Sequence, residues 1–426
     1  MLLGRPLLAA LLLAAGTTDA AAEALDAKAV QAPAAPAVQS LLDGYVQSGK
    51  LAGVVVAIGR GDRLPTFFSA GRISDERGAP PAGRDSLWRI YSMTKPITAM
   101  AAMKLVEDGK LRLDDPIATY IPAFRKMRVL TTPDSSLDSR PATQLITVRH
   151  LLTHSGGLTY QFLGKGPIRQ EYARLGLLGG RAGAQATKVQ PATLAEFANR
   201  LATLPLVSEP GTKWNYSVGA DLLGRVIEVA SGVPFQHFVS TRLLQPIGMI
   251  STYWTVPRSQ AARLATNYAW VANKRVAIDA APTSEWFSPP KVHYGGSGLV
   301  SSARDYDRFL RMLAGSGQVG GVRVLKPATV RLALSNLLPT GVRVVGSGTP
   351  SLPVAEGYGA GGWVYLADVP NGVRAGTYGW FGAAGTIAFI DRATGTRVTV
   401  MTNYFPADKW PLAIDVTNAL YGRHSR

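Results

Sequence analysis

β-Strand signals gather at the two ends of this chain, and helix signals fill the region between them. Near the N-terminus, residues 52–60 are apolar and β-branched, and residues 64–70 follow them after a Gly61-Asp62 turn, which predicts a buried hairpin. Further strands are predicted toward the C-terminus at residues 361–366, 385–391 and 396–404. One antiparallel sheet is the most economical way to use strands from both ends. The predicted fold class is therefore α+β, with helices flanking this sheet and a mainly helical lobe inserted.

Helix patterns define the rest of the predicted organisation. Helices at residues 38–48 and 409–421 are expected to cover the sheet. Between the two ends, helices are predicted at residues 148–153, 193–202, 220–231 and 235–244, and loops at the polar segments 133–142 and 177–190. We therefore expect a discontinuous α/β domain of residues 38–115 and 291–422, with a helical domain of residues 116–290.

The first residues predict export. Residues 1–22 combine a basic Arg5, a short apolar run and small residues, as a secretory signal peptide does. The apolar run is too short to span a bilayer comfortably, and no later stretch approaches its length. Residues 23–37, rich in Ala and Pro, are expected to form a linker. The expected protein is periplasmic or secreted, without stable membrane insertion.

Composition excludes several classes of function. The chain has no cysteine, so disulfides, thiolate chemistry and zinc fingers are excluded. The five histidines are not at metal-ligand spacings, and His150 and His154, one turn apart without a nearby carboxylate, are interpreted as structural. No metal or cofactor is expected. The net charge of +17 is compatible with attraction to anionic polymers or lipid surfaces, or with dispersed surface charge, but no basic run with interleaved aromatics predicts nucleic-acid binding.

The sharpest chemical signal is Ser92 followed by Lys95. The apolar run 97–106 predicts a buried helix, and Pro96 is tolerated only in its first turn. The helix therefore starts close to Ser92, and positions i and i+3 share a face, so the lysine can reach the serine hydroxyl. Serine needs an adjacent base to act as a nucleophile, and a desolvated lysine can supply it. The same spacing at Ser288 and Lys291 encloses two prolines, which exclude a helix. On this evidence alone, a capping serine beside an unrelated lysine remains an equal alternative.

Two later stretches display candidate functional groups. Tyr216 lies on a Pro-Gly loop that opens into a helix, where it is either a proton relay or a packed aromatic residue. Residues 378–386 are rich in glycine, which allows the close backbone approach of an oxyanion hole or marks a bend at a sheet edge. A Gly-x-Ser-x-Gly nucleophile elbow is absent, and the Gly-x-Gly-x-x-Gly at 357–362 precedes a strand, so it predicts no dinucleotide site.

Taken together, these motifs resemble the serine β-lactamase and penicillin-binding-protein superfamily, and most of all the family VIII carboxylesterases with their class C β-lactamase fold. The resemblance spans roughly residues 38–422. The stretches that carry it are Ser92–Thr98, His150–Leu158, Pro210–Ser217, Tyr294–Ser302 and Gly379–Thr386.

The resemblance implies a site. Ser92 would be the acylated nucleophile, Lys95 its base partner and Tyr216 the third member. The backbone N–H groups of Ser92 and Ala383 would form the oxyanion hole. The substrate pocket would include Val218, Trp380, Phe381 and Gly382, where β-lactamases carry an amide and a Lys-Thr-Gly segment; the bulky Phe381 bears on the size of the acyl pocket.

The sequence therefore predicts a serine esterase that cleaves short-chain carboxylic esters through an acyl-enzyme on Ser92. Its expected partner is a small-molecule ester, and its oligomeric state is not predicted. Two alternatives stay open: a β-lactamase or D,D-peptidase of the same superfamily, and a non-catalytic envelope protein that binds peptidoglycan-like ligands. Whether Lys95 or Tyr216 is the general base also stays open.

Overall fold

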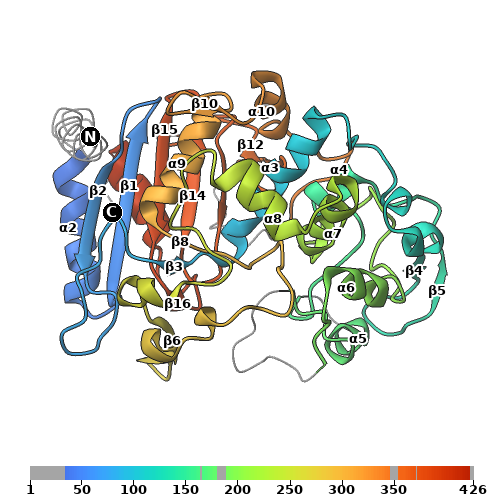
Figure 1. Ribbon diagram of the computed structural model, residues 1–426, viewed down its shortest axis with the longest axis horizontal. Coiled ribbons are helices and arrows are strands. Elements are labelled where there is room, and N and C mark those ends of the chain that lie inside the picture. The colour runs from blue at the N-terminus through green and yellow to red at the C-terminus, as the bar shows by residue number, and fades with distance from the viewer. Residues whose placement is uncertain (1–33, 164–165, 180–188, 346–353, 371, 423–426) are drawn as a thin grey trace, which may run out of the picture.

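The computed structural model describes residues 34–163, 166–179, 189–345, 354–370 and 372–422, and its centre is a seven-stranded antiparallel sheet (Figure 1). The strand order is β11-β12-β13-β14-β15-β1-β2. Their bounds are β1 Gly53–Arg60, β2 Thr66–Gly71, β11 Glu356–Tyr358, β12 Trp363–Tyr365, β13 Tyr378–Phe381, β14 Ile387–Asp391 and β15 Thr396–Met401. The N-terminal hairpin joins the C-terminal strands where β1 pairs with β15, so the predicted α+β fold is confirmed.

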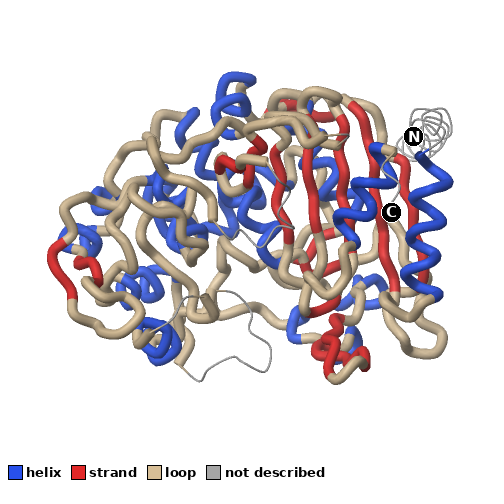
Figure 2. Tube along the Cα trace, turned by 180° about the vertical axis from the view of Figure 1, so that it is seen from behind, coloured by secondary structure: helices blue, strands red, loops and turns tan. Residues whose placement is uncertain are grey.

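Strand β1 is buried on both faces, because helices cover the sheet on each side. Val54, Val56 and Ile58 belong to the same core cluster as residues of α2 (Ala34–Gln47) and α11 (Leu412–Tyr421). Val55 and Ala57, which alternate with them, belong to the core that includes α9 (Ala303–Ala314). This alternation is the two-residue period of a strand between two layers. Figure 1 shows α9 in front of the sheet, and Figure 2 shows α2 beside the strands at its outer edge.

Helix α3 (Thr94–Glu107) separates the sheet from the helical lobe and is almost wholly buried between them (Figure 1). The lobe contains α4 (Val148–Leu152), α5 (Ile168–Arg174), α6 (Leu194–Leu201), α7 (Gly219–Ser231) and α8 (Phe235–Val239). Helix α3 packs against α7 and α8 in the lobe and against α10 (Pro327–Ala333). Within the described ranges, no helix combines the length and apolar character needed to cross a bilayer.

Four small sheets complete the fold. Strand β3 (Trp88–Arg89) pairs with β8 (Val300–Ser301), and β4 (Arg128–Leu130) pairs with β5 (Ser139–Pro141). The hairpin of β6 (Asn267–Val271) and β7 (Lys274–Asp279) adds β16 (Tyr404–Phe405) in parallel, and β9 (Gln318–Val319) pairs with β10 (Val322–Arg323). Strand β3 matters most for the site, because it leads directly into the turn that holds Ser92.

Several predicted boundaries are wrong. Helix α2 begins at Ala34, so the last four residues of the predicted linker 23–37 are helical. Strand β5 lies in the predicted loop 133–142, because its pairing with β4 is a backbone interaction that needs no apolar pattern. The predicted strand 396–404 divides into β15 and β16. The predicted signal peptide 1–22 and residues 180–188 of the predicted loop 177–190 lie outside the described residues.

Candidate active site

Ser92 and Lys95 meet at the start of α3. Ser92 lies in a short 3₁₀ turn, Tyr91–Met93, that leads into the helix at Thr94, and Pro96 occupies the first turn, where its missing N–H has no helical partner to lose. Lys95 is 1% exposed, whereas Ser92 is half-buried and accessible to solvent. The Lys95 Nζ lies 3.1 Å from the Ser92 Oγ. The structure thus brings the two residues together as their spacing predicts.

Tyr216 reaches the same serine from the helical lobe. Its hydroxyl lies 2.7 Å from the Ser92 Oγ, across 124 residues of sequence. The Lys95 Nζ is 4.7 Å from the centroid of the Tyr216 ring and 5.3 Å from that of Tyr160, so the charge of the lysine faces two aromatic rings. The serine hydroxyl therefore contacts an amine and a phenol at once.

A glycine-rich segment, residues 294–299, holds the start of α3 in place. The Lys95 Nζ donates to the Gly296 carbonyl at 2.8 Å, and the Thr98 hydroxyl donates to the Gly295 carbonyl at 2.7 Å. In return, the Leu299 N–H donates to the Thr94 hydroxyl at 3.2 Å. These three bonds attach one face of the helix to the segment, so the ammonium group has few positions open to it.

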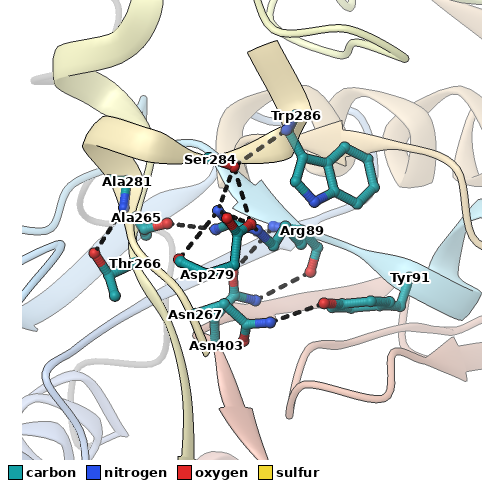
Figure 3. Close-up of polar contacts among 10 residues, drawn as sticks. All are labelled: Arg89, Tyr91, Ala265, Thr266, Asn267, Asp279, Ala281, Ser284, Trp286 and Asn403. Carbon is teal, nitrogen blue, oxygen red and sulfur yellow. Dashed lines mark hydrogen bonds and ion pairs between the residues drawn. The ribbon is translucent and has the colours of Figure 1, made fainter. Parts of the chain in front are cut away.

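Strand β3, on the other side of the serine, is fixed by a buried arginine (Figure 3). Arg89 is fully buried, and its guanidinium forms an ion pair with Asp279 at 2.5 Å and donates to the Ser284 hydroxyl at 3.0 Å. The Asn403 amide holds the backbone of the same residue, accepting from the Arg89 N–H at 3.1 Å and donating to its carbonyl at 3.0 Å. A paired, hydrogen-bonded charge of this kind satisfies its buried donors and pins the chain three residues before Ser92.

Tyr91, immediately before the nucleophile, has a backbone φ of 41°, which is uncommon for a bulky residue. The Asn267 amide donates to the Tyr91 hydroxyl at 2.8 Å (Figure 3), and the tyrosine ring packs edge-on against Trp286 and Phe405. A strained backbone persists only where the surroundings hold it, and here they belong to β6, to β16 and to the turn that contains Trp286. These contacts therefore fix the residue that precedes the nucleophile.

Aromatic rings surround Tyr216. Its ring centroid lies 4.8 Å from that of His154, 5.2 Å from Tyr160 and 5.5 Å from Trp380. Burial, together with the Lys95 charge, holds the pKa of His154 well below its usual value, so this histidine is neutral, and its Nδ1 lies 3.1 Å from the Ser217 hydroxyl. His154 thus packs behind the tyrosine without adding charge.

The predicted oxyanion segment lies against the nucleophile turn. A Cβ built on Gly382 would come within 2.4 Å of the Ile90 carbonyl oxygen, so only glycine allows this close approach. Ala383 follows it and is half-buried, like Phe381. Trp380, by contrast, is buried behind Phe381, with the two ring centroids 4.9 Å apart.

The prediction that Val218 lines the substrate pocket is wrong. Val218 is the residue before α7 and has no solvent-exposed surface, because it packs in the core of the lobe. Its carbonyl accepts the N–H groups of Asp221 and Leu222, which fixes the first turn of the helix. The side chain therefore belongs to the packing of the helix start.

The other sequence candidates lie apart from this site. Ser288 and Lys291 are not in a helix. His150 caps α4, since its Nδ1 accepts the Thr147 N–H at 3.2 Å, and burial lowers its pKa to about 4. Among the described residues, no three His, Cys, Asp or Glu side chains gather as a metal site would require.

The sequence analysis missed three groups that the structure adds to the site: the Tyr160 ring, the Gly296 carbonyl and the Asp221 carboxylate. Asp221 accepts the Gly296 N–H at 2.7 Å and is fully buried. An acid in the first turn of a helix looks like ordinary helix-dipole stabilisation, so the sequence pattern does not distinguish it.

The chain matches the family model described as Beta-lactamase over residues 38–418. It is 34% identical over 395 residues to Protein Rv1367c of Mycobacterium tuberculosis, covering 91% of this chain and 93% of that protein. It is 30% identical over 429 residues to Esterase EstB of Burkholderia gladioli, covering 96% and 100%. The solved structure of EstCE1, a hydrolase with promiscuous acyltransferase activity, aligns with a TM-score of 0.75 at 27% identity, covering 92% of this chain and 99% of that one.

Proposed function

Because this chain belongs to the Beta-lactamase family, we propose that it is a serine esterase that hydrolyses short-chain carboxylic esters through an acyl-enzyme on Ser92. The observation that carries the proposal is the position of the Ser92 Oγ, 3.1 Å from the Lys95 Nζ and 2.7 Å from the Tyr216 hydroxyl. A nucleophile within hydrogen-bond reach of its base is the arrangement that covalent catalysis needs. The similarity to Esterase EstB supports an ester as the substrate.

Acylation begins when the Tyr216 phenolate takes the proton of Ser92 and the Oγ attacks the ester carbonyl carbon. We assign the base to Tyr216 because the Lys95 Nζ has two acceptors, the Gly296 carbonyl and the Ser92 Oγ, as an ammonium group does, and the Tyr216 oxygen is the other group within hydrogen-bond reach of the serine. The Lys95 Nζ lies 4.7 Å from the centroid of the Tyr216 ring, so a positive charge faces the ring of the proposed base. In the tetrahedral intermediate, the backbone N–H groups of Ser92 and Ala383 stabilise the oxyanion. The intermediate collapses as the alcohol leaves with the proton from Tyr216.

Deacylation repeats the sequence with water. Tyr216 takes a proton from water, whose oxygen bonds to the acyl carbon. Collapse of the second intermediate breaks the bond to the Ser92 Oγ, which regains its proton from Tyr216, and the carboxylic acid leaves. A lysine that stays charged throughout serves both halves of the reaction equally.

Apolar surroundings favour an apolar ester over a carboxylated β-lactam. Half-buried Phe381 and buried Trp380 stand where the superfamily binds a substrate carboxylate with Lys-Thr-Gly. A carboxylate desolvated against aromatic rings without a hydrogen-bond partner is costly. Hydrolysis of β-lactams or peptides, and ligand binding without catalysis, are therefore the alternatives. The experiment below separates catalysis from binding, and kinetics on esters and cephalosporins separates an esterase from a β-lactamase.

The test is labelling and turnover in matched variants. An activated serine phosphonate is expected to label Ser92 alone, and Ser92→Ala is expected to abolish hydrolysis of p-nitrophenyl butyrate. Ser288→Ala is the control, because Ser288 has the same spacing to a lysine but lies outside the site. Substantial ester hydrolysis by Ser92→Ala would overturn the mechanism, and a wild-type protein that is neither labelled nor active on esters would favour the binding protein.

The proposal also covers the domain organisation of the enzyme and its location in the cell. Ser92 and Lys95 come from the proposed α/β domain of residues 38–115 and 291–422, and Tyr216 from the proposed helical domain of residues 116–290. The two would form the site between them. The proposed protein is exported after removal of residues 1–22 and acts on a small-molecule ester without a cofactor.

A further inference from the structure

We infer that Asp221 is a positioning residue for Lys95: it anchors Gly296, whose carbonyl binds the lysine, and its negative charge faces the positive charge of the lysine. The inference rests on the proposed function. Asp221 lies in the first turn of α7, fully buried. One carboxylate oxygen, Oδ1, accepts the Gly296 N–H at 2.7 Å. No residue that the structure describes donates a hydrogen bond to the other oxygen, Oδ2.

The backbone around Asp221 is shaped to admit a carboxylate. A Cβ on Gly296 would lie 2.9 Å from both carboxylate oxygens, and a Cβ on Gly179 would lie 2.6 Å from Oδ2. The two glycines come from separate segments, which the Ser297 hydroxyl joins by donating to the Gly179 carbonyl at 3.2 Å. Two independent close approaches to one side chain indicate that the site is built around it.

A short relay connects the carboxylate to the nucleophile. The Asp221 Oδ1 holds the N–H of Gly296, and the carbonyl of the same glycine accepts from the Lys95 Nζ at 2.8 Å. The lysine in turn donates to the Ser92 Oγ at 3.1 Å. The relay fixes the lysine through a backbone group, which moves less than a side chain would. Loss of the anchor would loosen the ammonium and with it the serine.

Charge makes the second contribution. The titratable groups that face Asp221 are Lys95 from α3, Tyr160 from the loop after α4 and Tyr294 from the glycine-rich segment. Of these, only Lys95 carries an opposite charge. In a buried site, opposite charges attract more strongly than they do in water. The carboxylate therefore holds the Lys95 ammonium by charge as well as through Gly296.

The same carboxylate makes the site sensitive to acid. Burial raises the pKa of Asp221 to about 6, although the Lys95 charge opposes the rise. Below that pH the carboxylate is neutral and the lysine loses its counter-charge. The acid limb of kcat/KM for ester hydrolysis is therefore expected to follow Asp221.

The experiment compares Asp221→Asn with Asp305→Asn in the full chain. Asparagine keeps the size of the side chain and an oxygen for the Gly296 N–H, and removes the charge. Asp305 is the matched control, because it is also buried and its pKa is also raised to about 6. It lies in α9, where it accepts hydrogen bonds from the Ser251 N–H and the Thr252 hydroxyl. We expect Asp221→Asn to lower kcat for p-nitrophenyl butyrate roughly tenfold to a hundredfold at pH 8 with little change in KM, and to lose the acid limb near pH 6. Asp305→Asn is expected to keep both.

The remaining outcomes distinguish a failure of the inference about Asp221 from a failure of the proposed function. An Asp221→Asn enzyme with the wild-type kcat and acid limb, or an equal loss in both variants, would overturn the role of the Asp221 charge, and wild-type activity in Gly296→Ala would overturn its role as an anchor. If the wild type hydrolyses no ester, the proposed function fails. The rate at which a phosphonate labels Ser92 then takes the place of turnover, with the same expected effects. If Asp221→Asn does not fold, Gly296→Ala displaces the contact and keeps the carboxylate, and wild-type activity in that variant would overturn the relay.

Discussion

Asp221 is expected to weaken the folded state at neutral pH, and the size of the effect follows from its burial. The pKa of this carboxyl is raised from 3.8 to about 6 in the folded protein, because burial disfavours the charged form. Between these two values the folded state binds one more proton than the unfolded state, so stability falls as pH rises. The shift corresponds to about 3 kcal/mol, at roughly 1.36 kcal/mol per pKa unit. Above pH 6 the protein is thus less stable than it would be with a neutral side chain.

The assay is urea unfolding of wild type and Asp221→Asn, followed by tryptophan fluorescence from pH 4 to pH 8. The free energy of unfolding of the variant, relative to wild type, is expected to increase by about 2 kcal/mol between pH 4 and pH 7, because part of the total of about 3 kcal/mol lies below pH 4. Asp114→Asn supplies a control of opposite sign, because a hydrogen bond from Arg149 lowers the pKa of Asp114. Its carboxylate contributes stability that is lost as pH falls, although its exposure keeps the effect small. A difference for Asp221→Asn that does not change with pH would refute the reasoning.

A second background tests the coupling to the lysine. The Lys95 charge lowers the pKa of Asp221, so Lys95→Met is expected to raise that pKa and move the pH window upward. Comparing Lys95→Met with the Lys95→Met, Asp221→Asn double variant measures this shift without any substrate. An unchanged window would mean that the two charges do not interact, and the relay would then be a matter of geometry alone.

Three further predictions concern other parts of the molecule. The value of kcat/KM for short-chain esters is expected to exceed that for penicillins and cephalosporins by roughly a thousandfold, because Trp380 and Phe381 offer no charge-assisted hydrogen bond to a substrate carboxylate. If steady-state kinetics give a cephalosporin the same kcat/KM as a butyrate ester, the result would instead favour a lactamase. Arg397→Met leaves Asp307 as an unpaired buried charge between β15 and α9, and is expected to lower the free energy of unfolding in urea by about 3–5 kcal/mol. A smaller decrease in the double variant Arg397→Met, Asp307→Leu would show that the loss of stability comes from the unpaired carboxylate. N-terminal sequencing of periplasmic protein is expected to begin near residues 20–25, and retention of Met1 would contradict export.

The sheet was predictable where a strand carries a local signal. Strand β1 contains the run Val54-Val-Val-Ala-Ile58, which is apolar and largely β-branched, and such a run predicts a strand buried between two layers. Strand β13 carries no such signal, since Tyr378-Gly-Trp-Phe381 mixes glycine with bulky rings, and only its pairing with β12 and β14 makes it a strand. Helix α9 was not predicted although it carries a local signal, a Ser302 N-cap followed by apolar residues at helical spacing. The burial of its Asp307 could not be predicted, because the partner Arg397 lies 90 residues away.

The part of the site that lies within one helical turn was predictable from the sequence. The part that depends on packing between distant segments was not. Ser92 and Lys95 meet because they are three residues apart at the start of a helix, whereas Tyr216 joins them only through the packing of the lobe against α3. The positive φ of Tyr91 has no local cause in the sequence, since tyrosine disfavours that conformation. It follows from the contacts of Asn267 and Trp286, which lie more than 170 residues away.

The two halves of the site are therefore held by two kinds of support. Before the serine, Arg89 is held by its ion pair with Asp279 and by Asn403, and Tyr91 by Asn267, so that segment gains rigidity without a free charge. After the serine, Lys95 is held by a glycine carbonyl whose anchor, Asp221, keeps an unpaired oxygen in the described part of the chain. If stability alone determined this position, a neutral residue would be favoured over aspartate, because the buried carboxylate lowers the free energy of unfolding above pH 6. Its presence, between two glycines that make room for it, is explained if the charge serves the lysine and not the fold.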